Sequence, residues 1–480
     1  MYWLLYLTLI TLVVNFFFAI LIVFFERRSP VSTLAWILIL FFIPIVGLIL
    51  YAFFGQNLRK KKKFKKKEKK DKFQRDIYRQ EVLLDNHNDG FINLEMPQLE
   101  DMIRLNLIGA DSLYTQNNYV EIYTTGKEKF EALLTSLESA ESYIHLEYYI
   151  FRNDIIGKQI LKILEQKAKN GVEVKFLYDG IGGISLPNHV FKKLKQNGGK
   201  VACFFPSFVP YLYLRVNYRN HRKIALIDGR EAFVGGFNIG DEYLGRSKVF
   251  GFWRDTHIKI KGDGINSLQR QFILDWNFAA KDNISFSKKY FPIRKLEKNI
   301  AMQIVASGPD STWTSIKDGY FKMITSACTN IYVQTPYFIP DESIFQALKV
   351  AALSGLDVKI IIPNKPDQPF VHWASYSYIG ELLNSGVRCY SYKKGFIHSK
   401  TIVIDSLISS IGTANVDVRS FNLNFEINAF IYDQNIAKKM EQIFLTDIED
   451  SEEITLETYN NRSLKIKSKE SISRLLSPIL

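Results

Sequence analysis

The hydrophobic pattern separates an apolar amino-terminal part from a longer part in which strands and helices alternate. No charged residue occurs from Tyr2 to Phe25, and a second uncharged run extends from Leu34 to Phe54. Each run is long enough to cross a hydrocarbon layer of about 30 Å as a helix. The pattern predicts two membrane helices joined by a short polar turn, Glu26–Pro30. Because Pro44 and Gly47 interrupt the second run, a re-entrant segment is the alternative there.

A cleaved signal peptide is the competing interpretation of the first run. This run has no basic leader, its apolar stretch is too long, and no small-residue cleavage site follows it. We therefore expect an uncleaved two-helix membrane anchor over residues 1–58.

A dense basic run, Arg59–Lys72, follows the second apolar run. Eleven Lys or Arg against Glu68 and Asp71 give it a charge of 11 − 2 = +9, out of +13 for the whole chain. Such a run favours the cytoplasmic side and attracts anionic headgroups by about 1 kcal/mol per charge. Its place beside a membrane helix favours anionic lipid over nucleic acid as the partner. The alternative is that the run only fixes the orientation of the membrane helices and binds no partner. We expect a multi-pass protein of the cell membrane with the rest of its chain in the cytoplasm. Arg27 and Arg28, in the polar turn, favour a cytoplasmic turn and thus the opposite orientation, but the eleven basic residues of Arg59–Lys72 outweigh these two.

The remainder of the chain is an internal duplication. After a polar helical connector, which completes residues 59–110, the same order of strand, helix and strand occurs twice. The matching segments are YIHLEYYIF from Tyr143 with NIYVQTPYFI from Asn330, GVEVKFLYD from Gly171 with GLDVKIIIP from Gly355, and LKQNGGKVACFF from Leu194 with LLNSGVRCYSY from Leu382. Strands that alternate with helices predict an α/β architecture. We expect one half over residues 111–295 and the other over residues 296–480.

Each half contains one copy of the pattern H-x-K-x4-D. The copies are HRKIALID, from His221 to Asp228, and HSKTIVID, from His398 to Asp405; a Gly and an Asn follow each at the same offsets, as Gly235 and Asn238 and as Gly412 and Asn415. The residues that follow each Lys are apolar and strand-forming. His and Lys, two positions apart, therefore project from one face of a strand.

Two histidines and two lysines around one cleft supply the chemistry of phosphodiester exchange. That reaction needs a nucleophile, a proton donor for the leaving oxygen, and positive charge around the phosphoryl oxygens. We expect no metal and no cofactor, because Lys and Asn donors provide the charge stabilisation. The competing interpretation is a pair of inactive surface strands in a duplicated fold. Cysteine chemistry is not expected, because Cys203, Cys328 and Cys389 are far apart and form no C-x-x-C pair.

The paired motifs resemble those of the phospholipase D superfamily, and the flanking sequences resemble its bacterial cardiolipin synthase branch. The resemblance covers nearly the whole chain, and the paired His, Lys and Asp positions all match. The stretches that carry it are GGFNIGDEYLG from Gly235, FWRDTHIKIKG from Phe252, GTANVDVRSFNLNFE from Gly412, YIHLEYYIF from Tyr143 and QTPYFIPDESIFQALKVAALSG from Gln334. The resemblance implies two pseudo-symmetric domains, each a sheet flanked by helices, packed on each other with the active site at their junction.

It also implies a reaction. His221 attacks the phosphorus of one phosphatidylglycerol and forms a phosphatidyl-enzyme, while His398 protonates the departing glycerol; a second phosphatidylglycerol then takes the phosphatidyl group and becomes cardiolipin. The two histidine roles can be reversed. Lys223, Lys400, Asn238 and Asn415 would hold the phosphoryl oxygens. Since one chain carries both half-sites, catalysis requires no homodimer.

Other polar residues have supporting roles in this interpretation. By resemblance, Glu426 hydrogen-bonds the inner nitrogen of a catalytic His, and Asp255 is the candidate for the same role in the first half. Asp228 and Asp405, at the far end of each strand, more plausibly anchor neighbouring backbone than touch substrate. His257 is expected to be a satisfied core histidine.

Three alternatives remain. Water can replace the second lipid, which would give a phospholipase D type hydrolase, and another alcohol would give a different phosphatidyltransferase. Outside enzymes, the chain can be a membrane-tethered binder of anionic lipid or nucleic acid, which the intact motifs disfavour.

The aromatic stretch Phe204–Tyr218 has two interpretations. It either touches the bilayer or acyl chains, or packs in the core.

Overall fold

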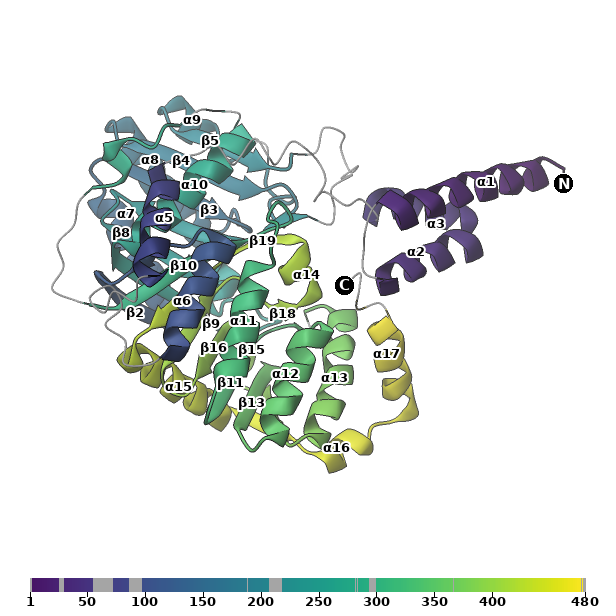
Figure 1. Ribbon diagram of the computed structural model, residues 1–480. Coiled ribbons are helices and arrows are strands. Elements are labelled where there is room, and N and C mark those ends of the chain that lie inside the picture. The colour runs from purple at the N-terminus through teal and green to yellow at the C-terminus, as the bar shows by residue number, and fades with distance from the viewer. Residues whose placement is uncertain are drawn as a thin grey trace.

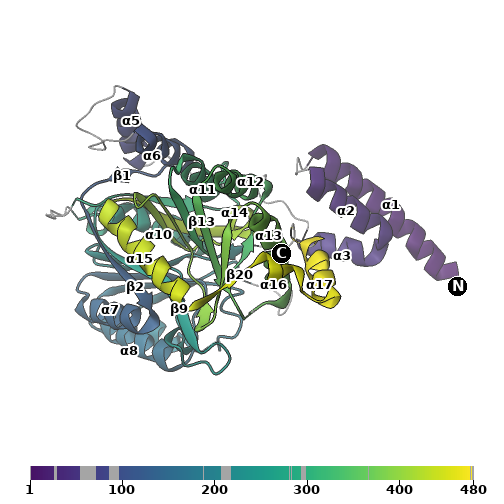
Figure 2. The ribbon, with the colours of Figure 1, turned by 90° about the horizontal axis from the view of Figure 1, so that it is seen from below.

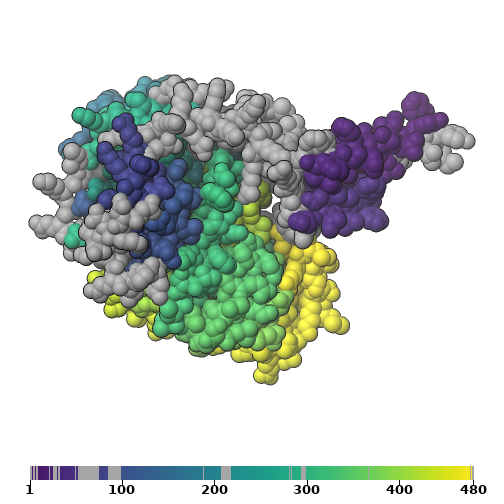
Figure 3. Space-filling view, viewed as in Figure 1, coloured from purple at the N-terminus to yellow at the C-terminus, as the bar shows by residue number. Residues whose placement is uncertain are grey.

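The computed structural model describes residues 2–25, 30–54, 72–85, 97–187, 189–206, 218–280, 282, 284–292, 299–365, 367–475 and 477. Helices at the amino terminus stand apart from a body in which other helices cover two β-sheets (Figures 1 and 3). The basic run Arg59–Lys72 lies outside the described residues except for its last position. Most of the aromatic stretch, residues 207–217, also lies outside them.

The second apolar run does not form the single helix that its hydropathy predicts. α1 (Tyr2–Phe25) is followed by α2 (Pro30–Phe42) and α3 (Pro44–Phe54). The break occurs because Pro44 has no amide hydrogen to donate to the carbonyl of Leu40, four residues earlier. Asn15 of α1 donates to that carbonyl instead, at 2.7 Å, and to the carbonyl of Pro44 at 3.0 Å. The expectation of two helices is therefore wrong, and a polar side chain from α1 stabilises the break.

In the part of the chain that the structure describes, no helix combines the length and the apolar character that a membrane crossing requires. The expected transmembrane helices are therefore not found among these residues.

Two mixed sheets form most of the body (Figures 1 and 2), and the central strands of one repeat the order of those of the other, while the second sheet has two further edge strands. The first has the order β15-β9-β8-β7-β3-β4-β5, with β2 paired to β9; the second has the order β1-β10-β19-β17-β16-β11-β13-β14-β20. Elements of the first half are β2 (Asn118–Thr125), α7 (Gly126–Ser139), β3 (Tyr143–Tyr148), α8 (Ile155–Lys169), β4 (Glu173–Asp179), α9 (Lys192–Gln196), β5 (Lys200–Phe204), β6 (Arg219–Asn220), β7 (Lys223–Ile227), β8 (Glu231–Gly235), the 3₁₀ turn η2 (Asp241–Leu244), β9 (Phe252–Gly262), α10 (Gly264–Ala280) and the 3₁₀ turn η3 (Lys288–Tyr290).

Elements of the second half follow the same plan. They are β1 (Tyr114–Thr115), β10 (Ala301–Ser307), α11 (Ser315–Ser326), β11 (Asn330–Gln334), β12 (Phe338–Ile339), α12 (Glu342–Leu353), β13 (Asp357–Pro363), α13 (Pro369–Asn384), β14 (Arg388–Tyr392), β15 (Gly395–Ile397), β16 (Thr401–Ile404), β17 (Ile408–Gly412), β18 (Val416–Asp417), α14 (Val418–Asn422), β19 (Asn424–Tyr432), α15 (Gln434–Glu449), β20 (Ser451–Ile454), α16 (Leu456–Asn460) and α17 (Leu464–Leu475). The α/β class with two sheets flanked by helices is as expected.

Three hydrophobic clusters hold the layers together. α7 and α8 pack on the outer face of the first sheet, and α11 to α13 pack on that of the second. α10 and α15 belong to a shared core that contains residues of both sheets, such as Leu226 and Val403. Both faces of the central strands are therefore covered, which explains why β7 and β16 are apolar without alternation after their Lys residues. The two halves are packed on each other through this shared core.

The predicted connector is also part of the body. α5 (Lys72–Asp85) and α6 (Pro97–Ala110) correspond to its helical pattern. Leu99, Met102 and Ile103 of α6 are buried in the core of the second half, and β1 adds to the edge of the second sheet at β10. The segment that precedes the first half in sequence thus covers the second half in space.

Two short strands cross from one half to the other. β6, from the first half, pairs in parallel with β19 of the second sheet, and β15, from the second half, pairs in parallel with β9 of the first sheet. Each ends directly before a motif histidine, His221 or His398. The crossing strands therefore deliver both histidines to the junction of the halves.

A buried ion pair also joins the halves. Arg254 of β9 donates to both carboxylate oxygens of Asp447 on α15, at 2.9 and 2.7 Å, and Gln334 donates to the same carboxylate at 2.7 Å. Both charged side chains are less than 10% exposed. Replacing one partner would leave the other charge buried without compensation, which typically costs about 3–5 kcal/mol.

We expect Arg254→Met to lower the free energy of unfolding by about that amount, measured by urea unfolding in detergent. The matched control is Arg230→Met, because Arg230 pairs with Glu141 at 3.4 Å on the open surface, where both side chains are at least 70% exposed. Such pairs stabilise little. Equal effects of the two substitutions would contradict the assigned role of the buried pair.

Candidate active site

Both motif histidines lie at the junction of the halves, and backbone hydrogen bonds to the opposite half hold them there. The amide of His221 donates to the carbonyl of Phe425 at 3.0 Å, and the amide of His398 donates to the carbonyl of Arg254 at 2.7 Å. Each histidine is 8% exposed. The imidazoles are thus fixed in position but retain some access to the outside.

Each histidine is paired with a carboxylate from the opposite half. Nδ1 of His221 lies 3.0 Å from both oxygens of Glu426, and Nδ1 of His398 lies 2.8 Å from Oδ2 of Asp255. Asp255 therefore serves the histidine of the second half and not that of its own half. Because an ionised carboxylate only accepts, Nδ1 carries the proton and Nε2 has the lone pair. Both imidazoles are set up to react through Nε2.

Each motif lysine lies beside its histidine. Nζ of Lys223 donates to the carbonyl of His221 at 2.6 Å, and Lys400 donates to the carbonyl of His398. Nζ of Lys400 also lies 2.8 Å from Nδ1 and 3.4 Å from Nε2 of His398, so its positive charge adjoins both ring nitrogens. Burial is the main cause that lowers the pKa of Lys223 to about 7 and that of Lys400 to about 8.

Burial also keeps both imidazoles neutral. It lowers the pKa of His221 to about 4, opposed mainly by the charge of Glu426, and that of His398 to about 3, with a further lowering from Lys400. A neutral imidazole is the form that attacks phosphorus. The histidine that donates a proton must gain it when an anionic phosphate enters, since a nearby negative charge raises the pKa of an imidazole.

The two asparagines of the motifs differ in their contacts. Asn238 accepts from the amide of Ile150 at 3.0 Å and donates to the hydroxyl of Tyr243 at 3.2 Å, so its side chain braces the loop after β3. Asn415 bonds to Asp417, and its Oδ1 has no hydrogen-bond partner among the described residues. Both side chains are buried, and each has one amide hydrogen beyond these contacts.

The motif aspartates lie at the other end of their strands. Asp228 accepts from the amides of residues 141 to 143 at 2.7–2.8 Å, and Asp405 accepts from the amides of residues 328 to 330 at 2.8–3.0 Å. Each therefore fixes the start of the neighbouring strand, β3 or β11. Neither has a described bond to a motif histidine or lysine.

A threonine that the sequence analysis missed supports one of the acids. Thr413 donates to Oε2 of Glu426 at 2.5 Å. The corresponding residue of the first half is Gly236, where a Cβ atom would lie 1.9 Å from Oδ1 of Asp255. The two positions could have been matched from the sequence, because Thr413 follows the motif Gly412 directly and Gly236 follows the motif Gly235 directly. The two half-sites thus use different means to orient their carboxylates.

His257 differs from expectation. It is fully buried, as expected of a core histidine. The expected hydrogen bonds are not found, because neither ring nitrogen has a partner among the described residues. Burial lowers its pKa far below the usual value, which keeps it neutral. It lies two residues from Asp255 on β9 and takes no direct part in the site.

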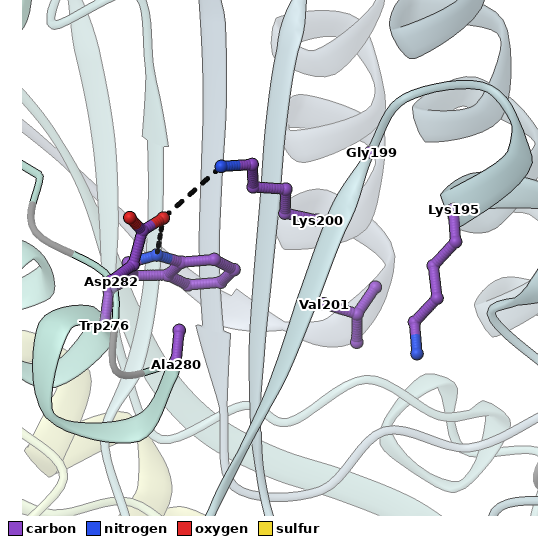
Figure 4. A pocket seen from close by; sticks show the side chains of 7 residues that line it. All are labelled: Lys195, Gly199, Lys200, Val201, Trp276, Ala280 and Asp282. Carbon is purple, nitrogen blue, oxygen red and sulfur yellow. Dashed lines mark hydrogen bonds and ion pairs between the residues drawn. The ribbon is translucent and has the colours of Figure 1, made fainter.

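A surface hollow elsewhere in the first half lacks this chemistry. Lys195, Lys200, Trp276 and Asp282 are among its lining residues, and Asp282 accepts from both Lys200 and Trp276 at 3.4 Å (Figure 4). Its one carboxylate is already paired, and it contains no histidine. The junction of the halves is therefore the candidate active site.

Known proteins share these features. The family model described as "Cardiolipin synthase, PLD-like domain" matches residues 133–252 and 320–448, and "Phospholipase D-nuclease N-terminal" matches residues 13–56. The cardiolipin synthase of Listeria innocua is 48% identical over 99% of both chains. That of Staphylococcus aureus strain Mu50 is 50% identical over 98% of this chain and 95% of its own.

A solved structure shows the same fold. Phosphatidylserine synthase of Haemophilus influenzae Rd KW20 aligns with a TM-score of 0.61 at 15% identity, covering 79% of this chain and 100% of that chain. The sequence resemblance is thereby confirmed over nearly the full length. The chain belongs to the cardiolipin synthase family, whose members carry phospholipase D-like domains.

Proposed function

We propose that this protein is a phosphatidyltransferase that makes cardiolipin and glycerol from two molecules of phosphatidylglycerol. The observation that carries the proposal is the pair of buried histidines, each held by a carboxylate of the opposite half and each beside a lysine. The names of the relatives in Listeria and Staphylococcus support the product. Both half-sites belong to one chain, so the reaction needs no second copy.

The proposed reaction proceeds in two displacements. Nε2 of His221 attacks the phosphorus of the first lipid, the bond from phosphorus to the glycerol oxygen breaks, and His398 gives that oxygen a proton. Nε2 of His398 then removes the proton from the glycerol hydroxyl of the second lipid. The resulting oxygen displaces His221 from phosphorus. Lys223 and Lys400 stabilise the charge on the phosphoryl oxygens.

Transfer and hydrolysis are separated by their products. We expect wild-type protein, given phosphatidylglycerol labelled in its free glycerol, to release labelled glycerol and to form cardiolipin in equal amounts. Phosphatidic acid as the main product would replace the proposal with a phospholipase D type hydrolase. Lipid binding without any turnover would favour a binding protein.

Activity is expected to have a bell-shaped dependence on pH. kcat/KM should rise as His221, the nucleophile, becomes neutral above about pH 4, and it should fall between about pH 7 and pH 8, because Lys223 and Lys400 lose the protons that bind phosphate. The measurement is the initial rate in mixed micelles across pH, with chemistry shown to be rate-limiting. A level profile from about pH 6 to about pH 10 would count against the assigned lysine role.

The proposal places the enzyme at the cell membrane, with α1 to α3 inserted in lipid and the body in the cytoplasm. Large apolar side chains cover the outside of these helices, among them Trp3, Phe24 and Phe42, which are 89%, 72% and 80% exposed. An apolar surface of this extent is stable only when lipid or protein covers it. The basic run Arg59–Lys72 would add attraction to anionic lipid.

A further inference from the structure

The outer face of α17 carries a stripe of apolar side chains. Leu464, Ile472 and Leu475 are 82%, 57% and 81% exposed. Together with Ser468 and Ser471, which are also exposed, they follow the i, i+4, i+7, i+8, i+11 spacing of one helical face. Single exposed leucines are common on proteins, but three large exposed apolar side chains on one face of a short helix indicate a contact surface.

Basic residues border this stripe. Lys465 and Lys467 are exposed at its edges. The one acidic residue of α17, Glu470, is buried and bonded to Arg462 at 2.9 Å, so it adds little negative charge to the outer face. The exposed face therefore has apolar side chains and small serines along its centre and positive charge along its edges, an arrangement that suits a helix in a membrane interface.

The other basic residues of the helix hold it against α13. Nζ of Lys469 lies 4.4 Å from the ring centroid of Trp373, and Arg474 pairs with Glu381 at 2.6 Å. Arg474 also lies over the ring of Tyr378, at 4.7 Å from its centroid. These contacts hold one side of α17 against α13 and leave its outer face exposed.

α13 connects this surface to the active site. The helix begins at Pro369, two residues after Asp367, whose carboxylate accepts from the hydroxyl of Tyr337. The ring of Tyr337 lies 6.5 Å from that of His398. Phe370, in the first turn of α13, is 53% exposed. The start of α13, with Phe370, is therefore linked through Asp367 and Tyr337 to the His398 half-site.

The amino-terminal helices lie on the same side. α17 and α1 to α3 are on one side of the body in both ribbon views, and the space-filling view shows the two groups close together (Figures 1, 2 and 3). A membrane that holds the apolar helices would therefore lie on the same side of the body as α17.

We infer that the outer face of α17, with Phe370, lies in the headgroup layer of an anionic lipid bilayer and sets the height of the active site above it. The phosphate of a membrane lipid lies in that layer, so a site held there meets its substrate without extracting the acyl chains. Lys465 and Lys467 would contact anionic headgroups. A second copy of the chain is the less suitable occupant, because its α17 would present the same positive charge. The inference rests on the proposed function only for the identity of the lipid substrate.

The test uses full-length protein in vesicles of phosphatidylglycerol and phosphatidylcholine. An environment-sensitive fluorophore is attached at Ile472→Cys or, as the matched control, at Ile155→Cys on α8, where Ile155 is 66% exposed on a different face. The exposed Cys328 is first replaced by Ser. Burial raises the pKa of Cys203 to about 12 and that of Cys389 further, so these thiols react slowly.

The expected result is a blue-shifted emission at position 472 that nitroxide groups on the acyl chains quench, with neither effect at position 155. Equal behaviour at the two positions would overturn the inference. A blue shift without lipid quenching would also overturn it, because protein would then cover the face.

A second measurement follows turnover. Combining Ile472→Asp with Leu475→Asp should raise the KM for lipid in mixed micelles about tenfold and leave kcat unchanged, while Ile155→Asp changes neither. An unchanged KM in the double variant would overturn the role in substrate access. If position 472 is quenched by lipid but the protein makes no cardiolipin, the proposed function fails and the membrane contact stands.

Discussion

Replacing His221 by Ala is expected to lower kcat by on the order of 10⁴-fold or more, because the proposed mechanism assigns the bond to phosphorus to its Nε2. His398→Ala should cause a loss of about 10²- to 10⁴-fold with the natural lipid, the usual contribution of a general acid. The measurement is cardiolipin formation from phosphatidylglycerol, with the thermal unfolding midpoint as the check on folding.

A substrate with a different leaving group separates the two roles. In a phosphatidyl ester of nitrophenol the leaving group departs without a proton. His398→Ala should therefore release nitrophenol in a burst near the wild-type rate and accumulate a phosphatidyl-enzyme. His221→Ala should release none. The opposite pattern would reverse the assignment of nucleophile and acid, and loss of the burst in both variants would contradict the two-step mechanism.

Removing either cross-half carboxylate is expected to have the next largest effect. Glu426→Gln and Asp255→Asn keep the shape of the side chain but remove the charge that stabilises the imidazolium and fixes the proton on Nδ1. We expect kcat to fall by about 10²- to 10⁴-fold with little change in KM, since these acids do not touch the substrate. In Glu426→Gln the pKa of His221 should fall further, which would move the acidic limb of the profile to lower pH.

The chain provides a matched control for these substitutions. Glu173 lies 2.9 Å from Nε2 of the buried His145, a pair of the same type outside the site. Glu173→Gln should leave kcat unchanged. Equal losses from Glu173→Gln and Glu426→Gln would show that the effect is structural. Unchanged activity in Glu426→Gln, with intact folding, would remove the carboxylate from the mechanism.

Local patterns in the sequence predict the repeated elements well. The strands that precede each H-x-K segment appear in the structure where the duplication places them, as β3 with β11 and β4 with β13. This succeeds because the alternation of side chains along a strand is a property of neighbouring residues. The hydrogen bonds that Asp228 and Asp405 accept from backbone amides also join residues of the same half.

Other features depend on contacts that no local pattern contains. The second apolar run is split because Pro44 breaks the hydrogen-bond ladder, but the break is stabilised by Asn15, 25 residues from Leu40 in sequence. His257 is buried as its type suggests, yet its lack of partners depends on which groups surround β9. Likewise, the hydropathy of residues 97–110 gives no indication that α6 covers the second half.

The sequence by itself determines the chemistry: two imidazoles and two ammonium groups, each pair two residues apart on a strand, in a duplicated α/β chain. Tertiary structure alone decides which acid serves which histidine. Glu426 is 205 residues from His221, and Asp255 is 143 residues from His398. Spacing along one half pairs each acid with the wrong histidine, because β6 and β15 cross between the sheets before each histidine. The partnership arises only when the two halves pack on each other.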